Sequence, residues 1–387
     1  MKPGNGWGFP KIMEKPLAGT KVLDLSRILA GPLATMWMAD LGAEVIKVER
    51  PGVGDETRRW GPPFVGGESA YFLAVNRGKY GITLDLADEE GMATLRELIR
   101  VSDVLVHNFL PRTTRKLGIT YPEVSSINPG IIYIHITGFP PGPYHEEPGF
   151  DALVQAMGGL MAITGEGERP AKVGVAIVDV LCAWAALSGA LAALLSRERT
   201  GRGCMVPLSL CACSVAALIN VGQAFLLTGK EPKRLGTGHP HIVPYQAFPA
   251  ADGLFMVAVG TDAQFRGLCE AIGRPELILD PRFATNPARV EHRELLVSLL
   301  AGIFREKPRE YWIRLLKKYG VPAGPVNSLA ELFGDEGIVD GLLTEVEHPT
   351  VGRYKTVVCP LPQAQPPSSL PPPRLGEHTE MVLNRFR

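Results

Sequence analysis

Charge of one sign, paired cysteines and targeting signals are all scarce in this sequence. The formal net charge of the 387 residues is zero, so nothing draws the chain toward nucleic acid or an anionic membrane. Its six cysteines form no CxxC pair, which indicates free thiols in a reducing compartment rather than a disulfide framework. The first 15 residues resemble neither a signal peptide nor a transit peptide. We therefore expect a soluble cytoplasmic protein, or a mitochondrial matrix protein if the chain is a processed eukaryotic one.

Groups of metal ligands are also scarce. Cys211 and Cys213 lie in an apolar stretch without a nearby histidine, which favours packing over metal binding. His239 and His241 have no carboxylate or cysteine partner at ligand spacing, so a loop-packing role is expected for them as well. The sequence therefore predicts no metal site.

An uncharged run at 180–195 is headed by a single acid, Asp179. Alanine, leucine, valine and tryptophan dominate the run, which predicts a helix buried against a core with Asp179 at or just before its first turn. The run is shorter than a membrane span requires. Two interpretations of Asp179 remain open from the residues alone. It is a helix N-cap, which spacing favours, or a desolvated carboxylate nucleophile kept ionised by the helix dipole.

Strands and helices alternate in the N-terminal half. A βαβ unit is predicted from 21–25, 33–41 and 44–48, and further strands alternate with helices up to residue 136. This pattern predicts an α/β fold with a mostly parallel, doubly wound sheet. Glu49 lies where a dinucleotide fold places its ribose-binding acid, but the preceding turn offers only Gly31 where that fingerprint needs three glycines. A nicotinamide-dependent oxidoreductase is therefore disfavoured.

Basic residues follow two of the predicted strands. Arg50, Arg58 and Arg59 come after 44–48, and a second group that includes Lys116 comes after 103–106. Either group alone is as well explained by a solvated loop. Because both lie at the sheet edge where open α/β proteins bind ligands, together they suggest a phosphorylated ligand.

The C-terminal half predicts a smaller α+β domain. A strand at 253–259 is followed by three amphipathic helices within 264–318, after a long helix at 214–227. We expect a large domain over 1–227, a small domain with a glycine loop over 228–332, and a return segment over 333–387 that completes the large domain. Five prolines give the return segment polyproline character: Pro366, Pro367, Pro371, Pro372 and Pro373.

Eight motifs in order resemble the class III CoA-transferases, the carnitine/formyl-CoA transferase group (CaiB/BaiF type). The resemblance covers nearly the whole chain, and within the group it is greatest to succinyl-CoA-dependent dicarboxylate CoA-transferases, judged by GTGHPHIVPYQAF and EHPTVG. The motifs that carry it are LDLSRILAGP, GAEVIKVERPGVGD, NRGKYGITLDL, HNFLPRTTRKLG, GFDALVQAMGGLMAITG, VGVAIVD, GTGHP and PPPRLGEHT.

The resemblance implies a fold and a nucleophile. The fold is an interlocked homodimer, in which each chain has a Rossmann-like large domain built from both ends and a smaller domain between. The acid of VGVAIVD, Asp179, is implied to attack an acyl-CoA and to carry CoA as an aspartyl thioester. No proton transfer is needed, which accounts for the lack of a Ser-His or Cys-His pairing. CoA thioester is then a co-substrate, and no tightly bound cofactor is expected.

Further site residues follow from the same resemblance. Backbone N–H groups around Leu29 and Ala30 and in the loop of Gly236 and Gly238 are expected to stabilise oxyanions. Asp151 is either a helix cap or a second active-site acid. The formyl-CoA enzymes have glutamine where Leu29 stands and lysine where Ala87 stands, so Leu29 offers no side-chain donor. The CoA contacts are expected at Ile28, Arg50, Leu84, Asn108, Phe109 and Lys116.

Two other functions remain as alternatives. An α-methylacyl-CoA racemase would need a histidine directly before Asp151, and Phe150 stands there instead, which cannot carry a proton. A non-catalytic CoA-binding or nucleotide-binding protein would retain its ligand affinity without Asp179. The expected substrates are an acyl-CoA, with succinyl-CoA preferred as the donor, and a small carboxylate or dicarboxylate acceptor.

Overall fold

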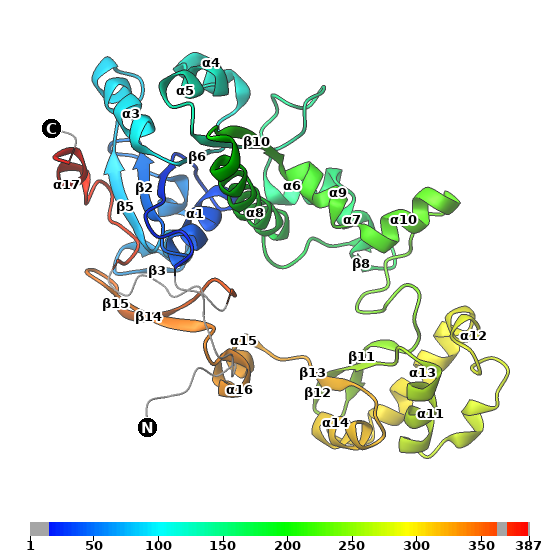
Figure 1. Ribbon diagram of the computed structural model, residues 1–387. Helices are drawn as coiled ribbons and strands as arrows, with labels where there is room; N and C mark the ends of the chain where they lie inside the picture. Colours follow the sequence, from blue (N-terminus) through cyan, green and yellow to red (C-terminus); the bar gives the residue numbers. More distant parts are fainter. Residues whose placement is uncertain (1–14, 362–369, 386–387) are drawn as a thin grey trace. The chain divides into compact units, whose positions relative to one another are not determined.

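The computed structural model describes residues 15–361 and 370–385 (Figure 1). These residues form two compact units, each described by itself. Unit 1 is built from the described residues of 1–160, 173–218 and 339–387, and unit 2 from 161–172 and 219–338. Pro366 and Pro367 of the expected polyproline segment lie outside the described residues.

A six-stranded parallel sheet forms the centre of unit 1. Its strands are β1 (Lys21–Asp24), β2 (Glu44–Glu49), β5 (Lys79–Thr83), β6 (Val104–His107), β7 (Ile132–Thr137) and β10 (Cys204–Ser209). They lie in the order β10-β7-β6-β1-β2-β5, and each neighbouring pair is parallel. This confirms the predicted α/β class. The order reverses between β1 and β6, and open α/β sheets bind ligands at the carboxyl ends of strands at such a point.

Helices cover both faces of this sheet. Alternate strand residues point to opposite faces, so Val22 and Val104 belong to one apolar cluster and Leu23 and Leu105 to another. The first cluster is shared with α1 (Ala30–Asp40) and α8 (Ile177–Thr200), and the second with α3 (Glu89–Val101), α5 (Tyr121–Ile127) and α17 (Thr379–Leu383).

The central helix α8 is longer than the uncharged run predicts. It has 24 residues, enough by length and composition alone to cross a membrane, so the expectation that it is too short was wrong. Its small residues, such as Ala186 and Ala190, are fully buried in unit 1. Trp184 packs on Trp37 of α1 with ring centroids 4.4 Å apart. The close packing of small residues on α1 and the sheet accounts for the apolar composition of α8.

The C-terminal segment lies along β5, the last strand of the sheet. The backbone N–H of His378 donates to the Gly81 carbonyl at 2.9 Å, and the Gly81 N–H donates to His378 Nδ1 at 3.1 Å. Upstream, the Gly78 N–H donates to the Leu370 carbonyl at 2.9 Å. Both ends of the chain therefore contribute to unit 1, and the edge of β5 is not left open.

Unit 2 has its own apolar core around a three-stranded antiparallel sheet, β11-β12-β13. Phe248, Phe255 and Phe304 are fully buried there and pack edge to face. The strands and main helices are β11 (Tyr245–Ala250), β12 (Gly253–Ala258), β13 (Ala323–Pro325), α11 (Asp262–Ala271), α13 (Arg293–Phe304) and α14 (Arg309–Lys318). The amphipathic periodicity predicted these three helices to within two residues.

A further local prediction was wrong. The helix expected over 214–227 is two helices, α9 (Leu210–Ala216) and α10 (Ile219–Thr228), because Ile219 at the start of α10 adopts a φ of +37° that interrupts a continuous right-handed helix. The remaining elements are η1 (Glu56–Arg59), β3 (Phe64–Val65), β4 (Glu68–Ser69), α2 (Ala70–Val75), α4 (Pro111–Leu117), α6 (Asp151–Met157), α7 (Leu160–Ile163), β8 (Gly165–Glu166), β9 (Arg169–Pro170), η2 (Pro275–Ile278), α12 (Asn286–Glu291), α15 (Leu329–Gly334), α16 (Glu336–Val339), β14 (Leu343–His348) and β15 (Gly352–Val357).

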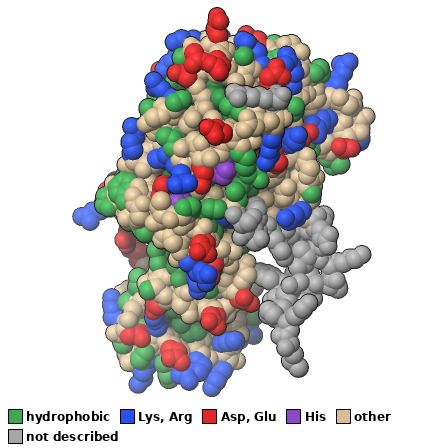
Figure 2. Space-filling model, turned by 90° about the vertical axis from the view of Figure 1, so that its left-hand side faces the viewer, with side chains coloured by type: hydrophobic (Ala, Val, Ile, Leu, Met, Phe, Trp, Pro, Cys, Tyr) green, Lys and Arg blue, Asp and Glu red, His purple; other side chains and the backbone are tan. Residues whose placement is uncertain are grey.

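The surface carries both signs of charge. On the face shown in Figure 2, acidic and basic side chains are intermixed, in keeping with the formal net charge of zero. The surface ion pairs of the described residues include Arg100 with Glu97 and Arg282 with Asp280. Exposed pairs of this kind add little to stability.

Candidate active site

A cavity of about 280 Å³ lies at the carboxyl edge of the parallel sheet, where the strand order reverses. Its walls come from the turn after β1, the loops after β6 and β7, and the first turn of α8. The lining residues are Arg27, Ile28, Leu29, Ala30, Glu56, Trp60, Asn108, Phe109, Leu110, Thr113, Ile136, Thr137, Gly138, Pro148, Gly149, Phe150, Asp179 and Leu210.

Asp179 is the third residue of α8 and is 8% exposed. The N-cap of this helix is Ala176, with no side-chain cap bond, so the N-cap interpretation of Asp179 was wrong. Burial, and then the negative charge of Asp151, raises the pKa of Asp179 from 3.8 to about 7. A carboxylate that is poorly solvated and yet ionised near neutral pH is a good nucleophile.

Asp151 supports the first turn of α8 from a different helix. It is the first residue of α6, where it makes no cap bond to its own helix; instead, its Oδ1 accepts the N–H groups of Val178 at 2.8 Å and Asp179 at 3.4 Å. Its Oδ2 accepts Nε2 of the fully buried Gln155 at 2.6 Å. Gln155 Oε1 in turn accepts the Val173 N–H at 2.9 Å. The expected local cap is therefore replaced by a series of hydrogen bonds that holds the start of α8, and with it Asp179, in place.

The turn between β1 and α1 presents backbone N–H groups at the cavity. Leu29 is the N-cap of α1 and gives no side-chain cap bond, and both Leu29 and Ala30 line the cavity. The first N–H groups of a helix have no partner within the helix and can serve an anion. Ile28 adopts a φ of +74°, which is strained for a β-branched residue. Its N–H donates to both carboxylate oxygens of Asp55 at 3.3 Å, which holds this conformation.

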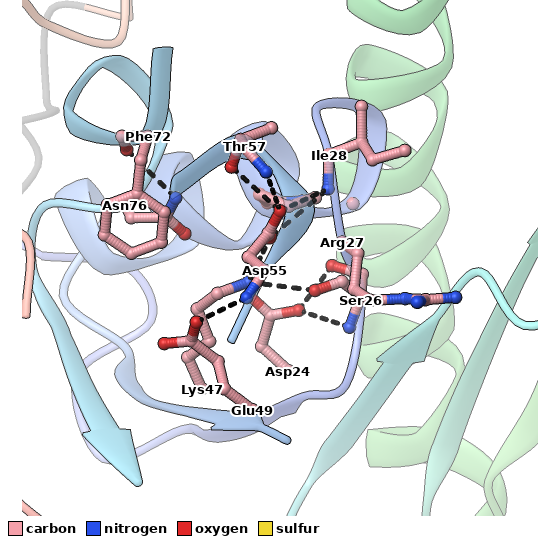
Figure 3. A network of polar contacts seen from close by, with 12 residues as sticks. Asp24, Ser26, Arg27, Ile28, Lys47, Glu49, Asp55, Thr57, Phe72 and Asn76 are labelled. Atoms are coloured by element: carbon pink, nitrogen blue, oxygen red, sulfur yellow. Dashed lines mark hydrogen bonds and ion pairs between the residues drawn. The ribbon is translucent and has the colours of Figure 1, made fainter. Parts of the chain in front are cut away.

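Two buried lysines, Lys47 and Lys79, join this turn to the sheet, and Figure 3 shows Lys47 with Ser26 and Asp55. Lys47 Nζ donates to the Ser26 carbonyl at 2.9 Å and to Asp55 Oδ2 at 3.0 Å. Lys79 Nζ donates to Asp24 Oδ2 at 3.0 Å. Burial raises the pKa of Asp24, but Lys79 and then Lys47 outweigh it and hold the pKa at about 2. This network fixes the backbone that carries Leu29 and Ala30.

A second cavity of about 390 Å³ adjoins the first, since Arg27, Glu56, Phe109 and Thr113 line both. Apolar side chains from three strand ends dominate its lining. They are Leu25, Val48, Leu84 and Leu86, with Leu117 from α4; the charged lining includes Arg50 and the acids Glu49, Asp55, Glu56 and Asp85. Together the two cavities form one elongated site with an apolar outer part and a reactive carboxylate in the inner part, which suits a long ligand with one reactive end.

The expected CoA contacts divide between these cavities. Arg50 and Leu84 line the outer cavity, Ile28 and Asn108 line the inner one, and Phe109 lines both. Three other predicted residues are placed elsewhere. Lys116 is exposed on α4 and lines neither cavity, and Gly236 and Gly238 belong to unit 2.

Some of the basic residues predicted at the sheet edge already form ion pairs with acidic side chains. Arg58 binds Glu49 through Nε at 2.7 Å and Nη2 at 2.6 Å, and both side chains are nearly buried. Glu49 is therefore occupied and is not a ribose ligand, in line with the rejection of a dinucleotide fold. Arg115, on the other cluster, binds Glu146 at 2.6 Å. Among the basic residues after β2, Arg50 is the one that lines the outer cavity.

The residues proposed above as packing groups have packing contacts. His239 stacks on Tyr245 with ring centroids 5.3 Å apart, and its Nδ1 accepts the His241 N–H at 3.1 Å. The six cysteines are free. Within residues 15–361 and 370–385, no three His, Cys, Asp or Glu side chains are grouped as a metal site would need.

Sequence reasoning missed the residues that support the site. Neither Arg27 nor Glu56, which line both cavities, was singled out, nor were Lys47 and Lys79. One signal was present for Lys47: it stands between the apolar residues Ile46 and Val48, and a buried lysine needs an anionic partner.

Asp179 is a buried carboxylate that lines a cavity large enough for a ligand, at the carboxyl edge of the parallel sheet. This arrangement defines the protein as an α/β enzyme. Its family follows from comparison with known proteins. The model of CoA-transferase family III matches residues 17–379, and the chain belongs to that family. It is therefore an enzyme that transfers CoA and uses a CoA thioester as co-substrate.

Known relatives align with nearly the whole chain. The succinyl-CoA:glutarate CoA-transferase of Mus musculus is 44% identical over 377 residues, 95% of this chain and 86% of its own. The succinate–glutarate CoA-transferase of Agrobacterium fabrum is 41% identical over 381 residues, 96% of this chain and 95% of its own. A crystal structure of a CaiB/BaiF family protein from Brucella suis matches with a TM-score of 0.85 and 40% identity, covering 97% of this chain and 100% of that one.

Proposed function

We propose that this enzyme transfers CoA from succinyl-CoA to a small dicarboxylate through an aspartyl-CoA thioester on Asp179. The observation that carries the proposal is the position of Asp179, buried at the start of α8 and facing a cavity that continues into a second, apolar one. The names of the two relatives support the choice of donor and acceptor.

The first half-reaction moves CoA onto the enzyme. An Asp179 oxygen attacks the thioester carbonyl of the donor, and the C–S bond breaks to give a mixed anhydride and the CoA thiolate. The thiolate then attacks the aspartyl carbonyl of the anhydride, which releases the donor acid as its carboxylate and leaves an aspartyl-CoA thioester. Thiolate and carboxylate are both acceptable leaving groups near neutral pH, so neither step needs a general acid.

The second half-reaction is the first in reverse with a different acid. The acceptor carboxylate attacks the aspartyl thioester, the CoA thiolate leaves, and the thiolate then attacks the acceptor carbonyl of the new anhydride. The products are acceptor-CoA and the free Asp179 carboxylate. Because each acid passes through an anhydride on the same aspartate, one cavity serves both donor and acceptor.

Each tetrahedral intermediate carries an oxyanion that needs hydrogen-bond donors. The backbone N–H groups of Leu29 and Ala30, at the start of α1 and at the same cavity as Asp179, are proposed for this role. Preorganised donors act without the cost of reorientation during the reaction. The bonds of Lys47 and Asp55 to the preceding residues would supply that preorganisation.

CoA is proposed to lie along the elongated site. Leu84 and Phe109 would contact its apolar parts, and Arg50 at the outer cavity would contact phosphate. Ile28 and Asn108 would line the path of the pantetheine arm to Asp179. The exposed ammonium of Lys116 would add only a solvated contact to an outer phosphate.

We further propose that the active form is an interlocked homodimer whose large domain is Rossmann-like. The strand order of unit 1, with its reversal between β1 and β6, and the return of the C-terminal segment onto β5 support the second part. The N–H groups of Gly236 and Gly238 already donate to the Gly165 and Leu235 carbonyls at 2.7 and 2.8 Å, so no oxyanion role is proposed for them. The expected compartment remains the cytoplasm or the mitochondrial matrix.

The racemase alternative lacks a second base. Phe150 lines the inner cavity directly before Asp151, where the two-base mechanism needs a histidine. Asp151 itself uses its oxygens for the α8 backbone and Gln155. Proton exchange at the α-carbon is therefore not proposed.

Trapping of the intermediate tests the proposal. The enzyme is incubated with succinyl-CoA without acceptor, then treated with hydroxylamine or borohydride, and its peptides are analysed by mass spectrometry. We expect the hydroxamate or the reduced alcohol on the peptide that contains Asp179, and none in the Asp179→Asn variant. Modification of any other peptide, or none in an enzyme that turns over, refutes the aspartyl-CoA mechanism.

A further inference from the structure

Arg27 occupies the junction of the two cavities and lines both of them. Its backbone is held by Asn108, whose Oδ1 accepts the Arg27 N–H at 3.0 Å and whose Nδ2 donates to the Arg27 carbonyl at 2.8 Å. Its guanidinium lies 5.6 Å from the centroid of the Phe109 ring. The side chain therefore has a defined place between the part proposed for CoA and the part that contains the nucleophile.

The inner cavity has one cation among its lining residues, all of which are described, and that cation is Arg27. Asp179 and Glu56 are the anions of the same lining. A dicarboxylic acyl group that reacts at Asp179 brings a second, unreactive carboxylate into this space. Burying that carboxylate without a cation would be costly, because the local dielectric is low.

Other cations near the sheet edge are already occupied. Lys47 and Lys79 are fully buried and are bonded to Asp55, Asp24 and neighbouring oxygens. Arg58 forms its two-pronged bond with Glu49. None of these three lines the inner cavity.

Arg27 retains donors for a ligand. Its described side-chain hydrogen bond is from Nη1 to Glu56 Oε1 at 2.6 Å, which leaves the edge formed by Nε and Nη2 for a second carboxylate. Glu56 Oε2 is buried without a partner in the described residues. Glu56 therefore orients the guanidinium in the free enzyme without saturating it.

We propose that Arg27 is the specificity-determining residue that binds the distal carboxylate of the dicarboxylic acyl group, in donor and acceptor alike. The proposal rests on the proposed function and names the feature of the substrate that the cavity selects. A planar guanidinium suits a carboxylate in a way that an ammonium does not, because it offers two parallel N–H groups.

The test compares substrates that differ only in the distal carboxylate. Initial rates are measured for succinyl-CoA against butyryl-CoA as donors, and for glutarate against pentanoate as acceptors, in wild type, Arg27→Gln and Arg27→Lys. We expect kcat/KM for succinyl-CoA and glutarate to fall about 10- to 100-fold in Arg27→Gln, the usual effect of removing one charge-assisted contact. The lysine variant should recover part of the loss.

The rates with the monocarboxylate substrates decide between the possible outcomes. Their kcat/KM should stay within about twofold of wild type, so that the preference for succinyl-CoA over butyryl-CoA falls by the full 10- to 100-fold. If butyryl-CoA turnover is below detection, the inhibition constant of free CoA replaces it, and it should be unchanged. Arg100→Gln removes an arginine from a comparably exposed ion pair on α3 and should leave every rate unchanged.

The proposal is overturned if the preference for succinyl-CoA over butyryl-CoA is unchanged. This holds whether kcat/KM falls equally for both substrate classes or for neither. Equal losses together with weaker inhibition by CoA would make Arg27 a CoA contact instead. Because Arg27 is 45% exposed at its side chain, the variant should fold, which near-wild-type unfolding curves would verify. Failure of the proposed function itself shows separately, as absence of the trapped Asp179 adduct in wild type.

Discussion

Two buried carboxylates in unit 1 have opposite environments. Asp24, fully buried at the end of β1, lies beside Lys79 and accepts hydrogen bonds from Ser26 and Thr35, and its pKa is held at about 2. Asp179 is almost as buried, but the charge nearest to it is the negative one of Asp151, and its pKa rises to about 7. Burial alone therefore does not decide what a carboxylate can do.

The difference lies in what compensates the lost solvation. Asp24 exchanges water for two cations and hydroxyl donors, so it is stable as an anion and has little tendency to react. Asp179 has the start of a helix in place of a cation, so its charge is only partly stabilised and remains available to a carbonyl carbon. Four experiments would sharpen or break this comparison.

Removing the isolated carboxylate should have the largest effect. Asp179→Asn should lower kcat/KM for CoA transfer by about 10⁴-fold or more, because the proposed anhydride and thioester both form on this carboxylate. Turnover is followed by chromatography of the acyl-CoA products. Asp280→Asn, at an exposed ion pair in unit 2, should keep full activity. Retention of more than a few per cent of activity by Asp179→Asn would contradict the assignment.

Removing the paired carboxylate should instead affect folding. Asp24→Asn leaves Lys79 and Lys47 buried with less compensating charge, and such changes cost about 3–5 kcal/mol of unfolding free energy. Urea unfolding at pH 7 measures the loss. A destabilisation below about 1 kcal/mol would mean that the lysines find other compensation and that the network does not hold the turn.

The contribution of Asp179 to the stability of the wild-type protein should depend on pH in the opposite sense to that of a salt-bridged acid, and the Asp179→Asn variant should lack this dependence. The Asp179 pKa is 3.8 in the reference state and about 7 in the folded protein, so ionisation begins to cost stability above about pH 4 and costs it in full above about pH 7. The shift corresponds to at most about 4 kcal/mol. The advantage of the Asn variant over wild type should grow from pH 4 to pH 8, as thermal unfolding at several pH values would show. A constant difference would indicate a normal pKa.

The smallest effect is expected from Asp151→Asn. Asparagine can still accept the Val178 N–H through its oxygen, but it removes the second cause of the raised Asp179 pKa. In wild type, the rate of the donor half-reaction should rise with pH through about 7, since the ionised form reacts. In the variant this rise should move to lower pH, with about a two- to fivefold gain in relative rate at pH 6. An unmoved profile would assign the shift to burial alone.

The sequence was sufficient for the features that depend on local pattern. The alternation of apolar strands and helices gave the parallel sheet, and amphipathic periodicity gave α11, α13 and α14. Asp179 was found as a lone acid before an apolar run, although its spacing favoured a cap. The family resemblance favoured the nucleophile interpretation over the N-cap interpretation, and the structure shows Ala176 at the N-cap position.

Features that depend on partners distant in the chain could not be predicted from the sequence. Local capping is the common case and favoured Asp151 as the cap of its own helix, yet the backbone N–H groups that it accepts lie 27 and 28 residues away. The Asp24–Lys79 pair joins β1 and β5, and its two residues are 55 positions apart in the chain with β2 between their strands in the sheet. The division of 214–227 into two helices depends on a left-handed backbone at Ile219, which an isoleucine gives no reason to expect.

The pairing of the C-terminal segment with β5 has a consequence for the order of events during synthesis. Residues 219–338, which make up most of unit 2, leave the ribosome before residues 370–385 do. Unit 2 can therefore fold while the chain is still being synthesised. Unit 1, which contains Asp179, is complete only after residues 370–385 have been added. We expect arrested translation products to show a protease-resistant core from the middle of the chain first.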